Sequence, residues 1–271
     1  MPLIERLAEG VTLYCGDCRE ILPTLDKANA VITDPPYEDE AHTLQRRVKR
    51  GGGINVEVLP FAQIKLHSRF EFCREIVPKC TGWALTFCQA EAVAEWRDAF
   101  ERAGAKYKRP MVWIKPDGMP QYSGDRPGMG YESIVAVWCD SGKSEWNGGG
   151  RHGVFTFNKN DNGSIAAPHP TTKPVTLMKE LICLFSNPTQ TILDPFMGSG
   201  STGVAAVKLG RKFIGIEIET NYFDIACKRI SDALNQPDLF VEWPAPPPQQ
   251  TWLDMWTKPF VAMTEGEGGP Q

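Results

Sequence analysis

The chain has 271 residues, 42% of them hydrophobic, and a formal net charge of −4 at pH 7. Its length and apolar content are sufficient for one large domain, or one domain with a small appendage, and exclude an intrinsically disordered chain. An acidic protein does not coat nucleic acid through its overall field, so any contact with DNA must be local.

Neither a membrane segment nor a disulfide framework is indicated. No run of about 20 apolar residues occurs, and Met1 to Arg6 lack the pattern of a signal peptide, so we expect a cytoplasmic protein that does not engage a membrane. The eight cysteines are scattered, which favours reduced thiols. Cys15 and Cys18 form a CxxC, but no second pair completes a zinc site, and we predict no metal.

Along the chain, short apolar runs alternate with helical patterns. The expected strands are Val11 to Tyr14, Ala30 to Thr33, Trp83 to Phe87, Met111 to Ile114, Ser133 to Trp138, Thr191 to Leu193 and Lys212 to Ile216. The expected helices include Phe70 to Ile76, Ala90 to Ala103, Leu177 to Phe185 and Thr202 to Leu209. This alternation predicts an α/β fold with a mostly parallel, doubly wound sheet covered on both faces.

The sequence Asp34-Pro35-Pro36-Tyr37 follows an expected strand directly. Prolines supply no backbone N–H, so the strand must end there, and its carbonyls are available to a group outside the sheet. An alternative is a rigid turn in which Asp34 caps a neighbouring amide and Tyr37 packs on the core edge. The motif alone does not decide between a turn and a binding site.

A second motif runs from Asp194 to Gly203 and also follows an expected strand. Its glycines satisfy GxGxxG, and Glu217 ends the next strand, so a nicotinamide dehydrogenase fits this spacing. However, a carboxylate at Asp194 would repel a pyrophosphate and attract an ammonium. S-adenosylmethionine carries an ammonium, a carboxylate and a ribose diol. The hydroxyls of Ser201 and Thr202 could hold the carboxylate, and Glu217 the diol.

Together and in this order, the motifs resemble those of the amino-group DNA methyltransferases of the beta class, in which the catalytic motif precedes the cofactor motif. The resemblance extends from about Val11 to Ile230. Its motifs are Gly16-Asp17, Asp34 to Tyr37, Tyr131-Glu132-Ser133, His169 to Pro174, Asp194 to Gly200 and Phe213 to Glu217. Thr172 departs from the glutamine that the family often has at this position.

The resemblance implies the Rossmann-like fold of a class I methyltransferase, with S-adenosylmethionine as cofactor. The implied catalytic residues are Asp34, Pro35, Pro36 and Tyr37. Asp17 should lie near the adenine of the cofactor, Lys173 and its neighbours near the methionine end, and Glu217 on the ribose. The cofactor-binding set is Asp17, His169, Thr171, Lys173, Asp194, Phe196, Gly198, Ser199, Gly200, Ser201, Thr202 and Glu217.

In this interpretation, the target base leaves the duplex and stacks on Tyr37, while Asp34 and the Pro35 carbonyl accept hydrogen bonds from its amino group. Aspartate at the first motif position favours adenine. The alternatives are the N4 amino group of cytosine and a catalytically silent DNA-binding regulator of the same fold. Methyltransferases of RNA or protein glutamine also use such motifs, but usually with the cofactor motif first.

We expect residues 1–241 to form the catalytic domain and 242–271 a tail rich in proline and tryptophan. Residues 38–68 should be a mobile loop on DNA, and residues 117–130 and 140–168 are candidate target-recognition segments. The predicted DNA contacts are Arg46, Arg47, Lys49, Arg50, Arg151 and Lys159, although the basic cluster in 38–68 could also be solvated surface charge. The expected partner is double-stranded DNA, with a homodimer and a cognate restriction endonuclease as further possibilities.

Overall fold

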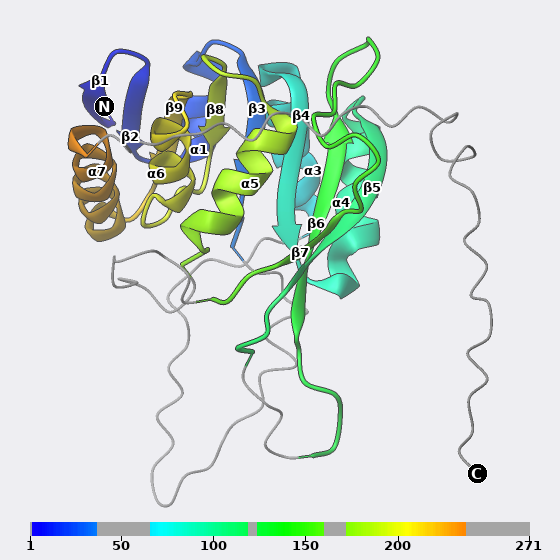
Figure 1. The fold of residues 1–271 in the computed structure, drawn as a ribbon. Coiled ribbons are helices and arrows are strands. Elements are labelled where there is room, and N and C mark those ends of the chain that lie inside the picture. The colour runs from blue at the N-terminus through cyan, green and yellow to red at the C-terminus, as the bar shows by residue number, and fades with distance from the viewer. Residues whose placement is uncertain (1, 37–65, 119–123, 160–171, 237–271) are drawn as a thin grey trace, which may run out of the picture.

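The computed structural model describes residues 2–36, 66–118, 124–159 and 172–236. Their strands form a nine-stranded sheet in the order β1-β2-β9-β8-β3-β4-β6-β5-β7 (Figure 1). Only β1 and β6 run against the other strands. The strands are β1 (Leu3–Ala8), β2 (Val11–Cys15), β3 (Ala28–Thr33), β4 (Cys80–Cys88), β5 (Lys106–Ile114), β6 (Tyr131–Trp138), β7 (Val154–Thr156), β8 (Thr191–Asp194) and β9 (Lys212–Glu217).

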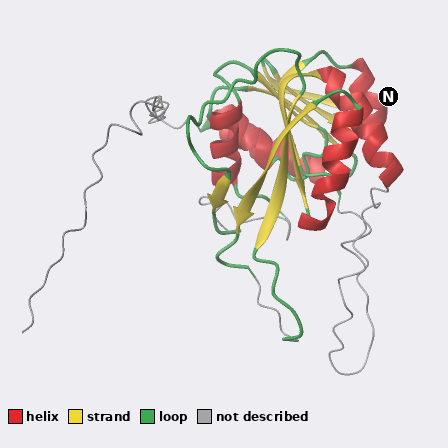
Figure 2. Ribbon diagram, turned by 90° about the vertical axis from the view of Figure 1, so that its right-hand side faces the viewer, coloured by secondary structure: helices red, strands yellow, loops and turns green. Residues whose placement is uncertain are grey.

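Helices cover both faces of this sheet, as the view along its edge shows (Figure 2). One face carries α5, α6 and α7, and the other carries α1, α3 and α4. The helices are α1 (Cys18–Ile21), α3 (Leu66–Ile76), α4 (Val93–Arg102), α5 (Val175–Phe185), α6 (Ser201–Lys208) and α7 (Thr220–Asn235), with short 3₁₀ turns η1 (Leu22–Thr24), η2 (Val77–Lys79) and η3 (Ala90–Ala92).

The central strands are buried on both sides and divide their side chains between two hydrophobic clusters. In β3, Ala30 and Ile32 join the cluster under α5, α6 and α7, whereas Val31 joins the cluster under α1, α3 and α4. Successive residues of a strand point to opposite faces, so a strand between two helical layers must be apolar on both. This explains why the sequence of β3 reads as a continuous apolar run.

The predicted fold class is confirmed: the sheet is mostly parallel and doubly wound. Besides short 3₁₀ turns, four elements were not among the expected ones, namely β1, α1, β7 and α7. The outer strand β1 is largely exposed, and β7 is three residues long within a segment expected to be irregular. Helix α7 buries Phe223, Ala226, Ile230 and Ala233, a helical spacing that was readable in the sequence. Helix α3 begins at Leu66, so the expected loop 38–68 ends earlier than predicted.

The order of strands reverses between β3 and β8. The chain continues from β3 to β4 on one side and from β8 to β9 on the other. In open α/β sheets, ligands bind beyond the carboxyl ends of the strands at such a reversal. Because β6 is antiparallel, β5 and β7 end, and β6 begins, at this same edge. The fold therefore gathers the ends of these strands around one place.

The predicted C-terminal tail, residues 242–271, lies outside the described residues, so that domain boundary stays a prediction. No helix in the described parts of the chain is long and apolar enough to cross a membrane.

Candidate active site

The first predicted motif lies at the carboxyl end of β3, beside β8. Thr33 is fully buried, Pro35 is buried, and the side chain of Asp34 is 28% exposed. The motif therefore continues from the core to the edge of the sheet, and its carboxylate is accessible from that edge. Tyr37 lies outside the described residues.

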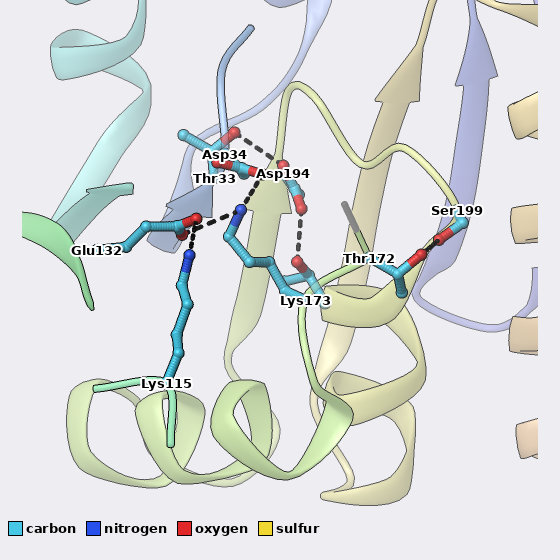
Figure 3. A network of polar contacts seen from close by, with 9 residues as sticks. Thr33, Asp34, Lys115, Glu132, Thr172, Lys173, Asp194 and Ser199 are labelled. Carbon is cyan, nitrogen blue, oxygen red and sulfur yellow. Dashed lines mark hydrogen bonds and ion pairs between the residues drawn. The ribbon is translucent and has the colours of Figure 1, made fainter. Parts of the chain in front are cut away.

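Asp34 belongs to a network of four charged side chains (Figure 3). Lys173, just before α5, pairs through Nζ with Asp34 Oδ2 and lies 3.3 Å from Glu132 Oε2. Glu132, the second residue of β6, accepts at Oε1 from Lys115 Nζ at 2.5 Å. Lys115 directly follows β5. The ends of four elements, β3, β5, β6 and α5, thus bring two carboxylates and two ammonium groups together.

The network controls the ionisation of its carboxyl groups. Burial raises the pKa of Asp34, Lys173 opposes that rise, and Glu132 adds to it. Burial also pushes the pKa of Glu132 upward, but Lys173 and Lys115 outweigh this effect and hold it below its ordinary value. Glu132 is therefore a fixed negative charge between two lysines, and the ionised form of Asp34 depends on Lys173.

Asp194 ends β8 and is buried by its own set of hydrogen-bond donors. Its Oδ1 accepts from Thr33 Oγ1 at 2.8 Å and from the Phe196 N–H at 3.1 Å, and its Oδ2 accepts from Thr202 Oγ1 at 2.5 Å. Burial raises the pKa of Asp194 to about 7, although the hydrogen bonds from Thr202 and Thr33 oppose the rise.

These contacts bear on the roles expected for two residues. The Thr202 hydroxyl has one proton and donates it to Asp194 in this structure, and its expected contact with the cofactor carboxylate stays a prediction. Asp194 is 3% exposed and joins β3, β8 and α6. Its expected contact with an ammonium stays a prediction.

The glycine loop after β8 combines open backbone with close packing. Gly198 has φ +51°, and a side chain built on it would meet no atom within 4 Å among the described residues. Gly200, at φ +83°, caps α6 and packs against Ala226 and Ile230 of α7. A ligand could approach the backbone at Gly198, whereas Gly200 serves the packing of the helix.

Glu217, at the end of β9, fixes this loop through its carboxylate. Oε2 accepts from the Gly198 N–H at 2.9 Å, and Oε1 accepts from the Glu219 N–H at 2.9 Å. Burial raises the pKa of Glu217, and the backbone hydrogen bonds oppose this. A carboxylate oxygen can accept more than one hydrogen bond, so Glu217 keeps acceptor capacity for a ligand.

Arg229 of α7 supports the same loop and was not predicted. It is buried, and its Nη1 donates to the Ser199 carbonyl at 2.6 Å and to Ser199 Oγ at 2.9 Å. It lies 3.5 Å from Ser201 Oγ. Thr172 Oγ1 and Ser199 Oγ are 3.3 Å apart, so the residue that stands where the family often has glutamine contacts the glycine loop.

Asp17 lies one strand further along this edge. Gly16 donates its N–H to the Glu217 carbonyl at 2.9 Å, which places Asp17 beside the end of β9. Its carboxylate caps α1 and pairs with Arg19, whose hydrogen bond lowers the pKa of Asp17. Asp17 therefore caps a helix in this structure, and its predicted contact with the cofactor adenine stays a prediction.

Two other predicted cofactor residues differ in their surroundings. Phe196 is half-buried and packs on Phe72 of α3 with ring centroids 5.3 Å apart. Lys173 was expected at the methionine end of the cofactor, and in this structure its ammonium pairs with the carboxylate of Asp34. Two cofactor residues lie outside the described residues: His169 and Thr171.

The predicted DNA contacts are only partly described. Arg151 pairs with Glu180 of α5, so its charge is balanced within the protein. The backbone N–H of Lys159 donates to Asp117 Oδ1 at 2.8 Å, which brings the candidate segments 117–130 and 140–168 together beyond β5 and β7. The basic residues of the first loop lie outside the described residues: Arg46, Arg47, Lys49 and Arg50.

Lys115 and Glu132 are the main site residues that sequence reasoning missed. Glu132 was quoted within a motif but given no role, and Lys115 carried no signal beyond its position at the end of an expected strand. Both are charged residues at the end of a strand, on the edge of the sheet where the site lies. This position is the signal that could have identified them.

Comparison with known proteins agrees with this site. A family model described as DNA methylase, for N6 and N4 methyltransferases, matches residues 137–228. The type II methyltransferase M.HinfI of Haemophilus influenzae is 26% identical over 264 residues, covering 84% of this chain and 70% of that protein. M.Cfr9I of Citrobacter freundii is 32% identical over 146 residues, and the match spans about half of each protein, 50% and 48%.

A solved structure is similar over a larger share of its own length. The M1.HpyAVI–SAM complex is 28% identical, with a TM-score of 0.63, covering 80% of this chain and 98% of that one. These matches in sequence and in structure support a DNA methyltransferase of the amino-group family. This methyltransferase family depends on S-adenosylmethionine. The open backbone at Gly198 and the remaining acceptor capacity of Glu217 fit that cofactor.

Proposed function

We propose that this chain transfers a methyl group from S-adenosylmethionine to the N6 amino nitrogen of adenine in duplex DNA. The observation that carries the proposal is the junction of the two motifs. Asp34 follows Thr33, and Thr33 Oγ1 donates to Asp194 Oδ1 at 2.8 Å. The catalytic carboxylate and the glycine loop therefore belong to adjacent strand ends, as a direct transfer between two bound molecules requires.

On the cofactor side, the proposed contacts follow from the loop geometry. Each carboxylate oxygen of Glu217 accepts one backbone N–H, and its remaining lone pair accepts a hydrogen bond from a ribose hydroxyl. The backbone at Gly198 lies against the ligand, and Ser201 with the first amides of α6 holds a carboxylate. Asp17 lies near the adenine. When bound, S-adenosylmethionine supplies an activated methyl group on a sulfonium sulfur.

On the substrate side, Asp34 and the Pro35 carbonyl accept the two hydrogens of the amino group. The lone pair of such a nitrogen is delocalised into the ring, and acceptors on one side favour a pyramidal, nucleophilic nitrogen. The amino nitrogen would take the methyl group that the sulfonium supplies, and the proton that it then gives up would pass to solvent. Tyr37 stacks on the base, which must leave the duplex to reach this pocket.

Adenine is proposed because aspartate, not serine, is the first residue of the catalytic motif. The amino group of cytosine presents a similar exocyclic amine, so N4 methylation is the competing outcome. A cognate restriction endonuclease, a homodimer and a cytoplasmic location remain predictions from the sequence.

The test is to identify the methylated nucleoside. Unmethylated duplex DNA is incubated with the protein and S-adenosylmethionine carrying a deuterated methyl group, then digested and measured by mass spectrometry. We expect deuterated N6-methyladenine. N4-methylcytosine would overturn the base assignment, and no methylated base on DNA of mixed sequence would overturn the function. Sequencing of DNA from a methylation-free host that expresses the protein then gives the recognition site.

Asp34→Ala is the matched variant for this test. Loss of the acceptor should lower the single-turnover rate by about 10²-fold or more. The affinity for S-adenosylmethionine should stay within a few fold, because Lys173 remains paired with Glu132. If calorimetry instead shows lost cofactor binding at an unchanged rate of transfer, Asp34 has no catalytic role.

A further inference from the structure

The contact between Lys173 and Asp34 restricts how the catalytic carboxylate can be used. Lys173 Nζ pairs with Oδ2 of Asp34, leaving Oδ1 outside this contact. Lys173 is 7% exposed in its side chain and lies 5.1 Å from the centroid of the Phe87 ring. A buried ammonium in this position fixes the orientation of the carboxylate through Oδ2 and leaves Oδ1 outside the contact.

Lys173 is itself held in place by the ion pair of Glu132 on β6 with Lys115 after β5, which we call the brace. Glu132 Oε2 lies 3.3 Å from its ammonium, and Glu132 Oε1 accepts from Lys115 at 2.5 Å. Lys115 also lies 4.7 Å from the centroid of the Trp113 ring. Glu132 and Lys115 have 11% and 12% of their side chains exposed, so water screens this brace weakly.

The charges that face Asp34 come from every element around it. They are the ammonium of Lys173 before α5, the carboxylate of Glu132 on β6, the ammonium of Lys115 after β5 and the carboxyl of Asp194 on β8. An opposite charge in contact favours the ionised form of a carboxyl group, and a like charge opposes it. Lys173 and Glu132 therefore act on Asp34 with opposite signs.

We propose that Lys173 and Glu132 are positioning residues for the methyl transfer. Lys173 keeps Asp34 ionised, with one oxygen presented to the target amino group, and Glu132 acts through Lys173 by holding it in place. The inference rests on the proposed function. It assigns Lys173 to the catalytic carboxylate, beside which its ammonium lies, and gives the Tyr131-Glu132-Ser133 motif a role.

The test compares four variants by their single-turnover rate against pH. Lys173→Met removes the charge, and Lys173→Arg keeps it. Glu132→Gln removes the brace, and the double variant Lys173→Met/Glu132→Gln measures whether the two residues act as a unit. The control is Glu75→Gln, which breaks an exposed ion pair with Arg74 on α3.

For Lys173→Met we expect the rate to fall about tenfold or more and its acid limb to move up by about one pH unit or more, because Asp34 loses the charge that favours its ionised form. Lys173→Arg should restore the position of the limb. Glu132→Gln should lower the rate but move the limb downward, because it removes a like charge. Cofactor affinity and the KM for DNA should stay within a few fold.

The double variant decides the relation between the two residues. If Glu132 acts through Lys173, the rate of the double variant should match that of Lys173→Met within about twofold. If the double variant instead loses the full effect of Glu132→Gln in addition, Glu132 does not act through Lys173. A Lys173→Met profile identical in shape to those of the wild type and Glu75→Gln would overturn the role of Lys173.

A measurement that does not depend on methyl transfer separates this inference from the proposed function. Carbon-13 NMR of protein labelled at the aspartate side-chain carboxyl follows the titration of Asp34, which is assigned by its absence in Asp34→Asn. The Asp34 titration should move to higher pH in Lys173→Met. A wild-type protein that methylates no DNA would overturn the proposed function, while an unmoved titration would overturn the network.

Discussion

At the scale of single residues, Asp194 shows how a motif carboxylate can serve the fold. Its two oxygens accept from Thr33, Phe196 and Thr202 and so join the end of β3, the loop and the start of α6. Its pKa, raised to about 7 by burial, lies above the ordinary value of 3.8. Between these values the folded protein binds a proton that the unfolded chain has released.

The sign of the resulting pH dependence follows from linkage. The contribution of Asp194 to the free energy of unfolding is largest below its unfolded pKa and declines as the pH rises toward 7, by up to about 1.4 kcal/mol per pH unit. The group cannot titrate in Asp194→Asn. The wild type should therefore gain stability relative to this variant as the pH falls from 8 to 5, as measured by urea unfolding without cofactor. A difference that stays constant, or grows in favour of the variant, would contradict the raised pKa.

The sequence identified Asp34 and Lys173 as site residues but not their contact. They are 139 positions apart, and only the winding of the sheet brings α5 against the end of β3. Lys115 had only its position at a strand end as a signal, and Arg229 had none, because a charged residue within a helix is usually solvated. Short motifs define residue types and their spacing. The contacts between charged side chains depend on the tertiary structure.

At the scale of elements, the short helix α6 depends on two kinds of glycine. Gly203 faces α7 and β9, where an added Cβ would lie 2.4 Å from Ile230 Cδ1 and 2.7 Å from Phe213 Cε1. Gly198 faces open space at the same end of the sheet. A GxGxxG pattern therefore combines one position needed for a ligand with another needed for packing, which the sequence alone does not separate.

This difference predicts that alanine at the two positions has different effects on stability and on cofactor binding. Gly203→Ala should lower the free energy of unfolding by about 1 to 3 kcal/mol through overpacking. Gly198→Ala should cost only about 1 kcal/mol for its positive φ, yet weaken S-adenosylmethionine binding about tenfold or more, because the Cβ occupies the space of the ligand. Urea unfolding and calorimetry measure the two effects. Equal losses of stability, with cofactor affinity unchanged in Gly198→Ala, would contradict this division of roles.

Most elements were predictable because a parallel sheet between two helical layers needs continuous apolar strands. The seven expected strands correspond to β2, β3, β4, β5, β6, β8 and β9. The missed strands are those that this rule does not cover. The outer strand β1 carries Glu5 and Arg6, and β7 pairs with β5 through three residues only.

At the scale of the whole molecule, every described functional segment leaves from one edge of the sheet. The strands β3, β8 and β9 end there, and the antiparallel β6 begins there (Figure 1). A protein of net charge −4 must bring DNA to this edge through local positive charge. The sequence predicts that charge in the segment that follows Tyr37.

Neutralising Arg46, Arg47, Lys49 and Arg50 together should therefore weaken binding to all DNA sequences. Each phosphate contact contributes about one unit to the slope of log affinity against log salt, so the slope should fall by up to about 3 to 4 units while base preference survives. Fluorescence anisotropy over a series of salt concentrations measures it. An unchanged slope would return the cluster to ordinary surface charge.

The connection between β5 and β6 is closed at its base, where the Lys115 N–H donates to the Gly130 carbonyl at 2.8 Å. Lys115 and Glu132 therefore stay at the sheet, at the base of this connection. The connection between β5 and β6 can thus change in length or sequence during evolution without moving these two residues. We therefore predict that a change of target sequence through the segment 117–130 would leave the contact between Lys115 and Glu132 in place.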